Sequence, residues 1–560
     1  MVKKQEKQKK DEEIEFEIKN PELLILSIFL LGLFILQLRV TLNNPIAFGD
    51  EGYHGMLQRY IGLNVDYPKW HPYYSNPLGE MGVSDNPLWH LLGASLFMIF
   101  RSDIVIKVLP PFIGVICVGY ISYFLGKKLF NNKTIAFVTA VITVTTPSVV
   151  TYSVLNYKDA MMTFYFTFFV LSFVLYLKNN DKKFGLLAGI FGGLLVLGKT
   201  SGYAMVPTIF GIFLLYEIFS EKNLKVIIKF LPIFVLIILV TSGFFLRNLI
   251  LYKTPICSAF IPFFSVDKCN LTKIKYEPKY QMEGRTVQVG TEMTPFKLGM
   301  QNYFEFAYGY LWFLPLFFFL GLFYFTTKRE KERILTLLVF ISFLPIYYIA
   351  FKSRAEDTAR WIMPLVPIMA LIASIYLKNI YDFLEKNIKL ISIIFFLFII
   401  FISFMNFNQK IKTMNVVKKF SPEFLQACDW AKKNTPKDAR LGAIIYMPAA
   451  GYNCDRNIAA GGPDVVLSQN NTLMLSVLHM QNATHLFIQK SLIAWDDAKL
   501  SERHPISFVR YLENNPTDFV KVYETGPNLN QCMLQGGCDG IIIYELNYTG
   551  KNLIPIEKLI

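Results

Sequence analysis

The sequence predicts an α-helical protein that crosses a membrane many times and carries a small soluble α/β domain at its C-terminal end. Of the 560 residues, 53% are hydrophobic and 16% are aromatic, which is far more apolar than an ordinary soluble protein. Long apolar runs follow one another over residues 22–406. Residues 407–560 return to a mixed composition in which short helix-like and strand-like segments alternate.

Eleven of the apolar runs reach, or nearly reach, the roughly 20 residues that a spanning helix needs. They begin near residues 22, 104, 134, 160, 184, 203, 226, 304, 334, 361 and 390. The apolar segment 87–100 is too short to span and contains His90, so it is typical of an interfacial or re-entrant helix. We therefore expect about 11 transmembrane helices.

Clusters of lysine and arginine fix the orientation. With an odd number of spans, the charged tail 1–21 and the later basic clusters all fall on one side, which the positive-inside rule identifies as the cytoplasm. The exterior then receives a first loop at 41–103, a second at 248–303 and the domain at 407–560. The formal charge of +14 thus reflects the membrane topology and does not indicate nucleic-acid binding, since the basic residues form no continuous stripe.

This topology places six of the seven cysteines outside the membrane, where disulfides can form. Cys257 with Cys269, and Cys532 with Cys538, are close enough in sequence to be candidate pairs. Buried free thiols are the alternative. The high Lys, Ile and Phe content and the compact loops favour an integral protein of a prokaryotic plasma membrane, with a cytoplasmic N-terminus and an extracytoplasmic C-terminal domain.

Acidic residues gather at the exterior ends of two spans. Asp50 and Glu51 directly follow the first span, and Asp159 precedes the fourth. Carboxylates at this depth are costly unless they have a partner or a function. Transfer of a sugar to a hydroxyl needs a carboxylate that removes the hydroxyl proton, so Asp50 is our candidate base. Asp50 and Asp159 together are also candidate ligands of a divalent cation, which the sequence does not require. Helix capping is the alternative for each acid.

Three cations stand at the same exterior ends. Lys199 interrupts the turn between the fifth and sixth spans, Arg360 begins the tenth and Arg247 ends the seventh. Arginine can bind a phosphate through two parallel hydrogen bonds, and lysine binds it as a point charge. These residues are therefore candidates for binding a lipid phosphate, with interfacial anchoring as the alternative. The three histidines of the first loop match no ligand spacing, so a zinc site is not favoured.

Four segments resemble the C-type (GT-C) polytopic membrane glycosyltransferases of the protein O-mannosyltransferase and aminoarabinose-transferase kind. They are Gly49–His54, Asn86–Trp89, Asn156–Asp159 and Gly193–Thr200. A fifth segment, Arg360–Pro367, is similar to a late span of these enzymes. The likeness covers roughly residues 20–380. It implies a polyprenyl-phosphate sugar donor such as dolichyl-phosphate mannose, transfer with inversion and a site on the exterior face.

The resemblance also implies roles for individual residues. Asp50 matches the base, Glu51 the acid that helps to place the sugar acceptor, and Asp159 the second-loop acid. Lys199 and Arg360 match cations that face the phosphate of the sugar donor. The loop expected to approach the acceptor contains two further residues, Tyr53 and His54.

Two other classes of function stay open at this point. A transporter or lipid flippase would also have many spans, but its essential charges should lie near the bilayer midplane. A receptor or scaffold without catalysis would leave the one-sided acids unexplained. The acceptor is open as well, between a protein, a lipid-linked glycan and a lipid, because the second exterior loop and the tail follow no pattern of the family.

Overall fold

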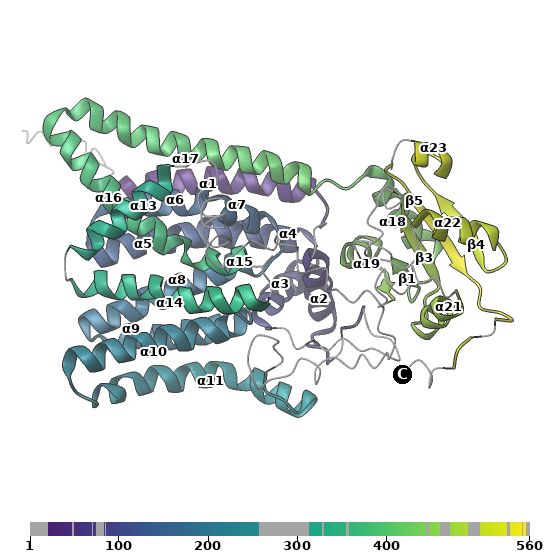
Figure 1. Cartoon of the computed structure of the whole chain (residues 1–560), viewed down its shortest axis with the longest axis horizontal. Coiled ribbons are helices and arrows are strands. Elements are labelled where there is room, and N and C mark those ends of the chain that lie inside the picture. Colours follow the sequence, from purple (N-terminus) through teal and green to yellow (C-terminus); the bar gives the residue numbers. More distant parts are fainter. Residues whose placement is uncertain are drawn as a thin grey trace, which may run out of the picture.

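The protein is a long helical bundle that carries a small sheet domain at one end (Figure 1). The structure, a computed structural model, describes residues 21–46, 50–69, 71–73, 83, 86–256, 313–327, 330–353, 358–443, 447–459, 471–490, 505–534, 538–551 and 553–555. All structural statements below concern these residues.

The bundle is formed by the helices from α1 to α17. They are α1 (Pro21–Asn43), α2 (Asp50–Asn64), α3 (Leu88–Phe100), α4 (Ile104–Pro111), η1 (Phe112–Cys117), α5 (Val118–Phe130), α6 (Lys133–Thr145), α7 (Pro147–Val154), α8 (Asp159–Asn179), α9 (Lys182–Gly198), α10 (Gly202–Glu221), α11 (Val226–Tyr252), α13 (Phe313–Thr326), α14 (Lys331–Ser353), α15 (Thr358–Ile362), η6 (Met363–Leu365), α16 (Val366–Asn387) and α17 (Lys389–Val417).

Seven of the described helical stretches are long and apolar enough to cross a membrane, and the pair α6–α7, bent by 58°, makes an eighth. The expected spans near 184 and 334 correspond to α9 and α14. The span expected near 304 begins outside the described residues, and α13 covers its later part. The chain is therefore an integral membrane protein, while the total of about 11 spans stays a prediction.

The spans pack closely where glycines replace larger residues. A Cβ atom added to Gly189 would lie 2.8 Å from Leu236, and one added to Gly193 would lie 2.6 Å from Val240. Both contacts join α9 to α11. Small residues allow the backbones of spanning helices to approach in this way. This packing fixes the end of α9, where Lys199 follows as the C-cap residue.

Helices α2 and α3 lie at the end of the bundle that faces the sheet domain (Figure 1). The predicted short helix at 87–100 is α3, which has 13 residues. Helix α2 was not foreseen, because its mixed sequence lacks a continuous apolar face. It begins at Asp50, so the first expected acid starts a helix and does not lie in an open loop.

The sheet domain combines parallel and antiparallel strands in the order β2-β1-β3-β5-β4. Strand β1 pairs in parallel with β2 and β3, and β5 pairs antiparallel with β3 and β4. The elements are α18 (Pro422–Asn434), β1 (Arg440–Ala443), α19 (Met447–Cys454), β2 (Asn457–Ile458), α21 (Asn471–Met480), β3 (His485–Gln489), α22 (Pro505–Asn514), β4 (Phe519–Glu524), α23 (Leu529–Leu534) and β5 (Ile541–Leu546). Helix α17 continues to Val417, past the expected domain boundary at 406.

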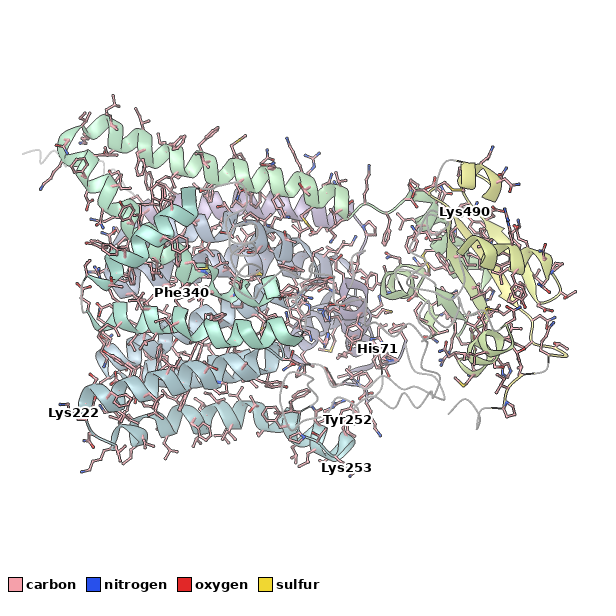
Figure 2. All side chains as sticks on the ribbon, viewed as in Figure 1. His71, Lys222, Tyr252, Lys253, Phe340 and Lys490 are labelled. Atoms are coloured by element: carbon pink, nitrogen blue, oxygen red, sulfur yellow. A yellow bond between two sulfur atoms is a disulfide. The ribbon has the colours of Figure 1, made fainter. Side chains whose placement is uncertain are left out.

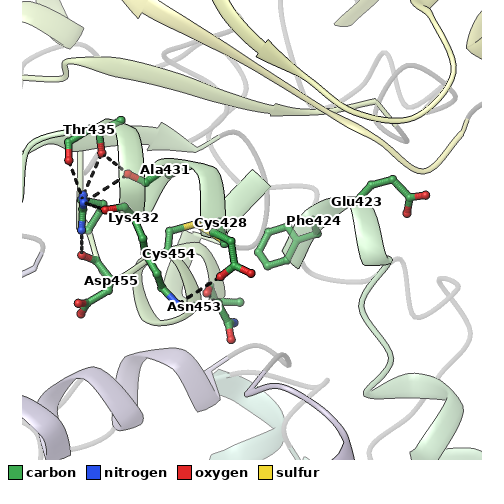
Figure 3. The surroundings of a disulfide bond; sticks show 12 residues. Glu423, Phe424, Cys428, Ala431, Lys432, Thr435, Asn453, Cys454 and Asp455 are labelled. Carbon is green, nitrogen blue, oxygen red and sulfur yellow. Dashed lines mark hydrogen bonds and ion pairs between the residues drawn. A yellow bond between two sulfur atoms is a disulfide. The ribbon is translucent and has the colours of Figure 1, made fainter. Parts of the chain in front are cut away.

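Two disulfides lie in this domain. Cys532 is joined to Cys538, and Cys428 is joined to Cys454, a pairing that sequence spacing did not suggest. The Cys428–Cys454 disulfide ties α18 to α19 (Figure 3). Helix α19 in turn contacts α2. Cys257 and Cys269 lie outside the described residues.

Candidate functional site

Four charged side chains predicted from the sequence meet at one end of the bundle. Asp50 begins α2, Asp159 begins α8, Lys199 follows α9 and Arg360 lies within the short helix α15. Ion pairs connect the four side chains. Residues far apart in the sequence are thereby joined into one cluster, which we call the carboxylate–cation cluster.

Asp159 is the buried centre of this cluster. Its Oδ1 accepts a hydrogen bond from Lys199 Nζ at 2.6 Å, and its Oδ2 accepts from Arg360 Nη2 at 2.9 Å. The side chain of Asp159 is 2% exposed, whereas those of Lys199 and Arg360 are 18% and 17% exposed. A buried carboxylate with two cationic partners holds both cations in place. Part of each cation still faces open space.

Asp50 is the exposed member of the cluster, with 60% of its side chain accessible. Its Oδ2 lies 3.7 Å from Arg360 Nη1, and its backbone N–H donates to the Tyr157 hydroxyl oxygen at 3.2 Å. The Arg360 guanidinium in turn lies 4.8 Å from the centre of the Tyr157 ring. Burial raises the pKa of Tyr157, which keeps its hydroxyl protonated. Asp50 therefore combines an exposed carboxylate with a backbone that a hydrogen bond holds in place.

The arrangement does not fit a cation held directly between Asp50 and Asp159. Both Asp159 oxygens already accept hydrogen bonds from side-chain cations, and Arg360 reaches both carboxylates. Within the described ranges, no three His, Cys, Asp or Glu side chains form a group suited to a metal. Arg360 thus supplies positive charge to both carboxylates in this arrangement.

Glu51 differs from its expected role beside the sugar acceptor. It is 1% exposed, and its Oε1 accepts hydrogen bonds from Lys418 Nζ at 3.0 Å and from the Asn156 backbone N–H at 2.8 Å. The adjacent acids therefore point into different environments, because successive residues on a helix face different directions. Glu51 joins segments of the chain, and Asp50 faces outward.

Tyr53 and His54 lie in a cluster of aromatic and imidazole rings. His54 Nδ1 and His90 Nε2 are 2.9 Å apart, and the Tyr53 and His71 rings are 4.6 Å apart. Burial is the main cause that lowers the pKa of His54, and the nearby Lys158 cation lowers it further. His54 is therefore neutral near pH 7 and packs inside the protein, where it has no direct access to an acceptor.

Arg247 does not join the carboxylate–cation cluster through any contact among the described residues. It donates to the carbonyl oxygens of Pro68 at 2.7 Å and Val83 at 3.3 Å. Its guanidinium lies 4.8 Å from the Tyr67 ring centre. Arg247 therefore attaches the first loop to the last turns of α11. Tyr252 and Lys253 mark this end of the helix in Figure 2.

Two site residues were not predicted from the sequence. Tyr157 was visible only as part of the segment Asn156–Asp159, and nothing local distinguishes its ring from an ordinary buried aromatic. Lys418 follows the last span in a stretch with several lysines. Its burial at 2% exposure could not be inferred from that surrounding composition.

A family model for dolichyl-phosphate-mannose-protein mannosyltransferases matches residues 85–245. This segment contains Asp159 and Lys199, whereas Asp50 and Arg360 lie outside it. No curated protein matches the sequence.

Several solved structures have a similar fold at low sequence identity. The apo oligosaccharyltransferase of Archaeoglobus fulgidus is 13% identical, with a TM-score of 0.61 over 97% of this chain and 76% of its own. ArnT from Cupriavidus metallidurans bound to undecaprenyl phosphate is 11% identical, with a TM-score of 0.60 over 95% of this chain and 99% of ArnT. The mycobacterial arabinofuranosyltransferase AftD is 12% identical, with a TM-score of 0.54 over 92% of this chain and 41% of AftD. A mannosyltransferase family model therefore matches the central part of the chain, and these membrane glycosyltransferases share its fold.

Proposed function

We propose that the chain transfers a sugar from a polyprenyl-phosphate donor to an acceptor hydroxyl at the exterior end of the bundle, with Asp50 as the general base. The observation that carries the proposal is an exposed carboxylate, Asp50, that pairs with the partly exposed Arg360, while the buried Asp159 holds both Arg360 and Lys199. Such a site offers a proton acceptor and an anion-binding group close to each other.

The cations suit the phosphate of a lipid-linked sugar. Lys199 and Arg360 each have one side occupied by Asp159, which orients them without covering them fully. They can stabilise the charge that develops on the departing lipid phosphate. The solved ArnT structure contains undecaprenyl phosphate, and one structure of the archaeal oligosaccharyltransferase contains dolichol-phosphate and an inhibitory peptide. Both support a lipid-phosphate donor here.

The proposed reaction is a single displacement. A carboxylate oxygen of Asp50 takes the proton of the acceptor hydroxyl as that oxygen forms a bond to the anomeric carbon. The bond between the anomeric carbon and the phosphate oxygen breaks, and the electron pair stays on the lipid phosphate beside Lys199 and Arg360. Because attack and departure occur on opposite faces of the sugar, the configuration inverts.

The position of the charges favours an enzyme over a transporter. The carboxylate–cation cluster is built from helix ends, whereas an alternating-access transporter should hold its essential charges near the middle of its spans. Helix α2, which begins at Asp50, belongs to the first exterior loop, and this loop is where we propose that the acceptor enters. The class of acceptor stays open between a protein, a lipid-linked glycan and a lipid.

The test is transfer of radiolabelled sugar from a panel of polyprenyl-phosphate donors by the purified full chain, with an acceptor extract. We expect Asp50→Asn to lower kcat by about 10²- to 10⁴-fold, the usual contribution of a general base. Asp66→Asn changes another exposed acid of the same region and should leave transfer unchanged. Equal activity of the native chain and Asp50→Asn would remove Asp50 from the base role.

A further inference from the structure

Lys418 connects the C-terminal end of the bundle to the start of α2. It is the C-cap residue of α17, immediately before the chain enters the sheet domain. Its ammonium donates to Glu51 Oε1 and to the Val154 carbonyl oxygen, both at 3.0 Å. The Lys418 and Glu51 side chains are 3% and 1% exposed. A charged pair so fully removed from water needs well-placed partners, and here each charge has at least two.

The same pair reaches the segment that carries Tyr157 and Asp159. Glu51 Oε1 accepts from the Asn156 backbone N–H at 2.8 Å, and the Asn156 amide donates to Gln58 Oε1 at 3.0 Å. Asn156 Oδ1 also accepts from Trp89 Nε1 at 3.1 Å. One buried network therefore joins the end of α17, the first turns of α2, the start of α3 and the connection between α7 and α8.

The sheet domain holds α2 from its other side. Arg59 of α2 donates to Asp455 at 3.1 Å and pairs with Asp103. Its guanidinium lies 4.3 Å from the centre of the Tyr452 ring. A Cβ atom added to Gly55 would lie 2.7 Å from that ring, so α2 and α19 are in close contact. Helix α2 is thus fixed between Lys418 at its start and the sheet domain along its length.

These contacts have one consequence for the reaction. Asp50 precedes Glu51 directly, and Tyr157 and Asp159 follow Asn156 closely, so both halves of the carboxylate–cation cluster are attached to the Lys418–Glu51 pair. We propose that Lys418 is a positioning residue, which sets the distance between Asp50 and the Asp159-bound cations without contacting the substrate. The proposal deepens the transferase function above and rests on it for its kinetic readout.

The kinetic test compares Lys418→Met with Lys419→Met in the full chain. Lys419 is the exposed neighbour of Lys418 and serves as the matched control. Displacement of reacting groups by about 1 Å can cost roughly 100-fold in rate. We expect Lys418→Met to lower kcat by about 10- to 100-fold while the KM for the polyprenyl-phosphate sugar changes less than about twofold. Lys419→Met should match the native chain.

A second variant separates positioning from charge balance. Lys418→Met leaves a buried carboxylate without its cation and can weaken folding, whereas the double change Lys418→Met with Glu51→Gln removes both charges. We expect the double variant to regain the native melting temperature and to keep the lowered kcat. Native kcat in the double variant, or a rise in KM alone in Lys418→Met, would overturn the positioning role.

Hydrogen exchange gives a readout that does not depend on activity. In Lys418→Met, amides of residues 50–54 and 155–158 should exchange faster, and those of α9 should not change. Unchanged exchange in the two segments would overturn the proposal. If the native chain transfers no sugar from any donor, the proposed function fails, and the exchange result still decides whether Lys418 holds these segments.

Discussion

The two ends of the bundle both carry ion pairs, but among the described residues only the end that faces the sheet domain has pairs in which both partners are largely buried. Where the bundle faces the sheet domain, Asp159 is 2% exposed and pairs with two cations. At the opposite end, which Lys222 marks in Figure 2, the side chains of Lys229 and Glu221 are 42% and 38% exposed. Exposed pairs contribute little to stability, whereas a buried charge must be matched. Burial of both partners therefore distinguishes the carboxylate–cation cluster from the pairs at the opposite end, where even the buried Glu217 has a partner, Lys331, that is 35% exposed.

The largest stability effect should follow from Asp159→Asn. The substitution leaves Lys199 and Arg360 without their shared counter-charge, and removing one partner of a buried pair costs about 3–5 kcal/mol. We expect a clearly lower melting temperature in detergent, followed by circular dichroism. Asp181→Asn is the matched control at the opposite end, because Asp181 caps α9 and asparagine caps equally well. Equal melting temperatures for the two variants would contradict the comparison.

A smaller effect should appear on acidification, through His54. Its pKa is lowered in the folded protein, so the unfolded chain takes up a proton below about pH 6.5 that the folded chain does not. Stability therefore falls as the pH decreases through that value, by roughly 1 kcal/mol at one pH unit below it. Melting curves of the native chain and His54→Gln at pH 7.5 and 5.5 should show the smaller pH dependence in the variant. Identical pH dependence would exclude His54 as a source.

The smallest effect should come from Lys229→Met at the opposite end. Both partners of its pair with Glu221 are well exposed, so the change should alter stability by less than about 1 kcal/mol. The melting temperature and the transfer rate should both stay near the native values. A loss as large as that of Asp159→Asn would mean that burial does not separate the two ends.

The sequence was a good guide to the membrane helices and to the charged residues at their ends. Apolar runs of about 20 residues have few alternative structures, so α1, α8, α11 and α17 begin close to the predicted positions. Asp50, Asp159, Lys199 and Arg360 could be selected because charges at the ends of apolar runs need a reason. Their mutual pairing through Asp159 depends on tertiary packing, which periodicity does not encode.

Three residues have environments that come from distant segments, which the sequence alone does not show. Glu51 looked like a partner of Asp50, yet its neighbours are Lys418 and Asn156. Arg247 looked like a phosphate ligand, yet it contacts carbonyl groups of the first loop. Cys428 was not matched with Cys454, because 26 residues separate them and only the packing of α18 against α19 brings them together.

The Lys418–Glu51 pair can form only late during synthesis of the chain. The two residues are 367 positions apart, and ribosomes add roughly 5–20 residues per second. Glu51 therefore spends roughly 20 to 70 seconds in the nascent chain before its cation exists. Until Lys418 emerges, the start of α2 lacks its final partner, so Asp50, the proposed base, is placed only after the bundle helices have been made.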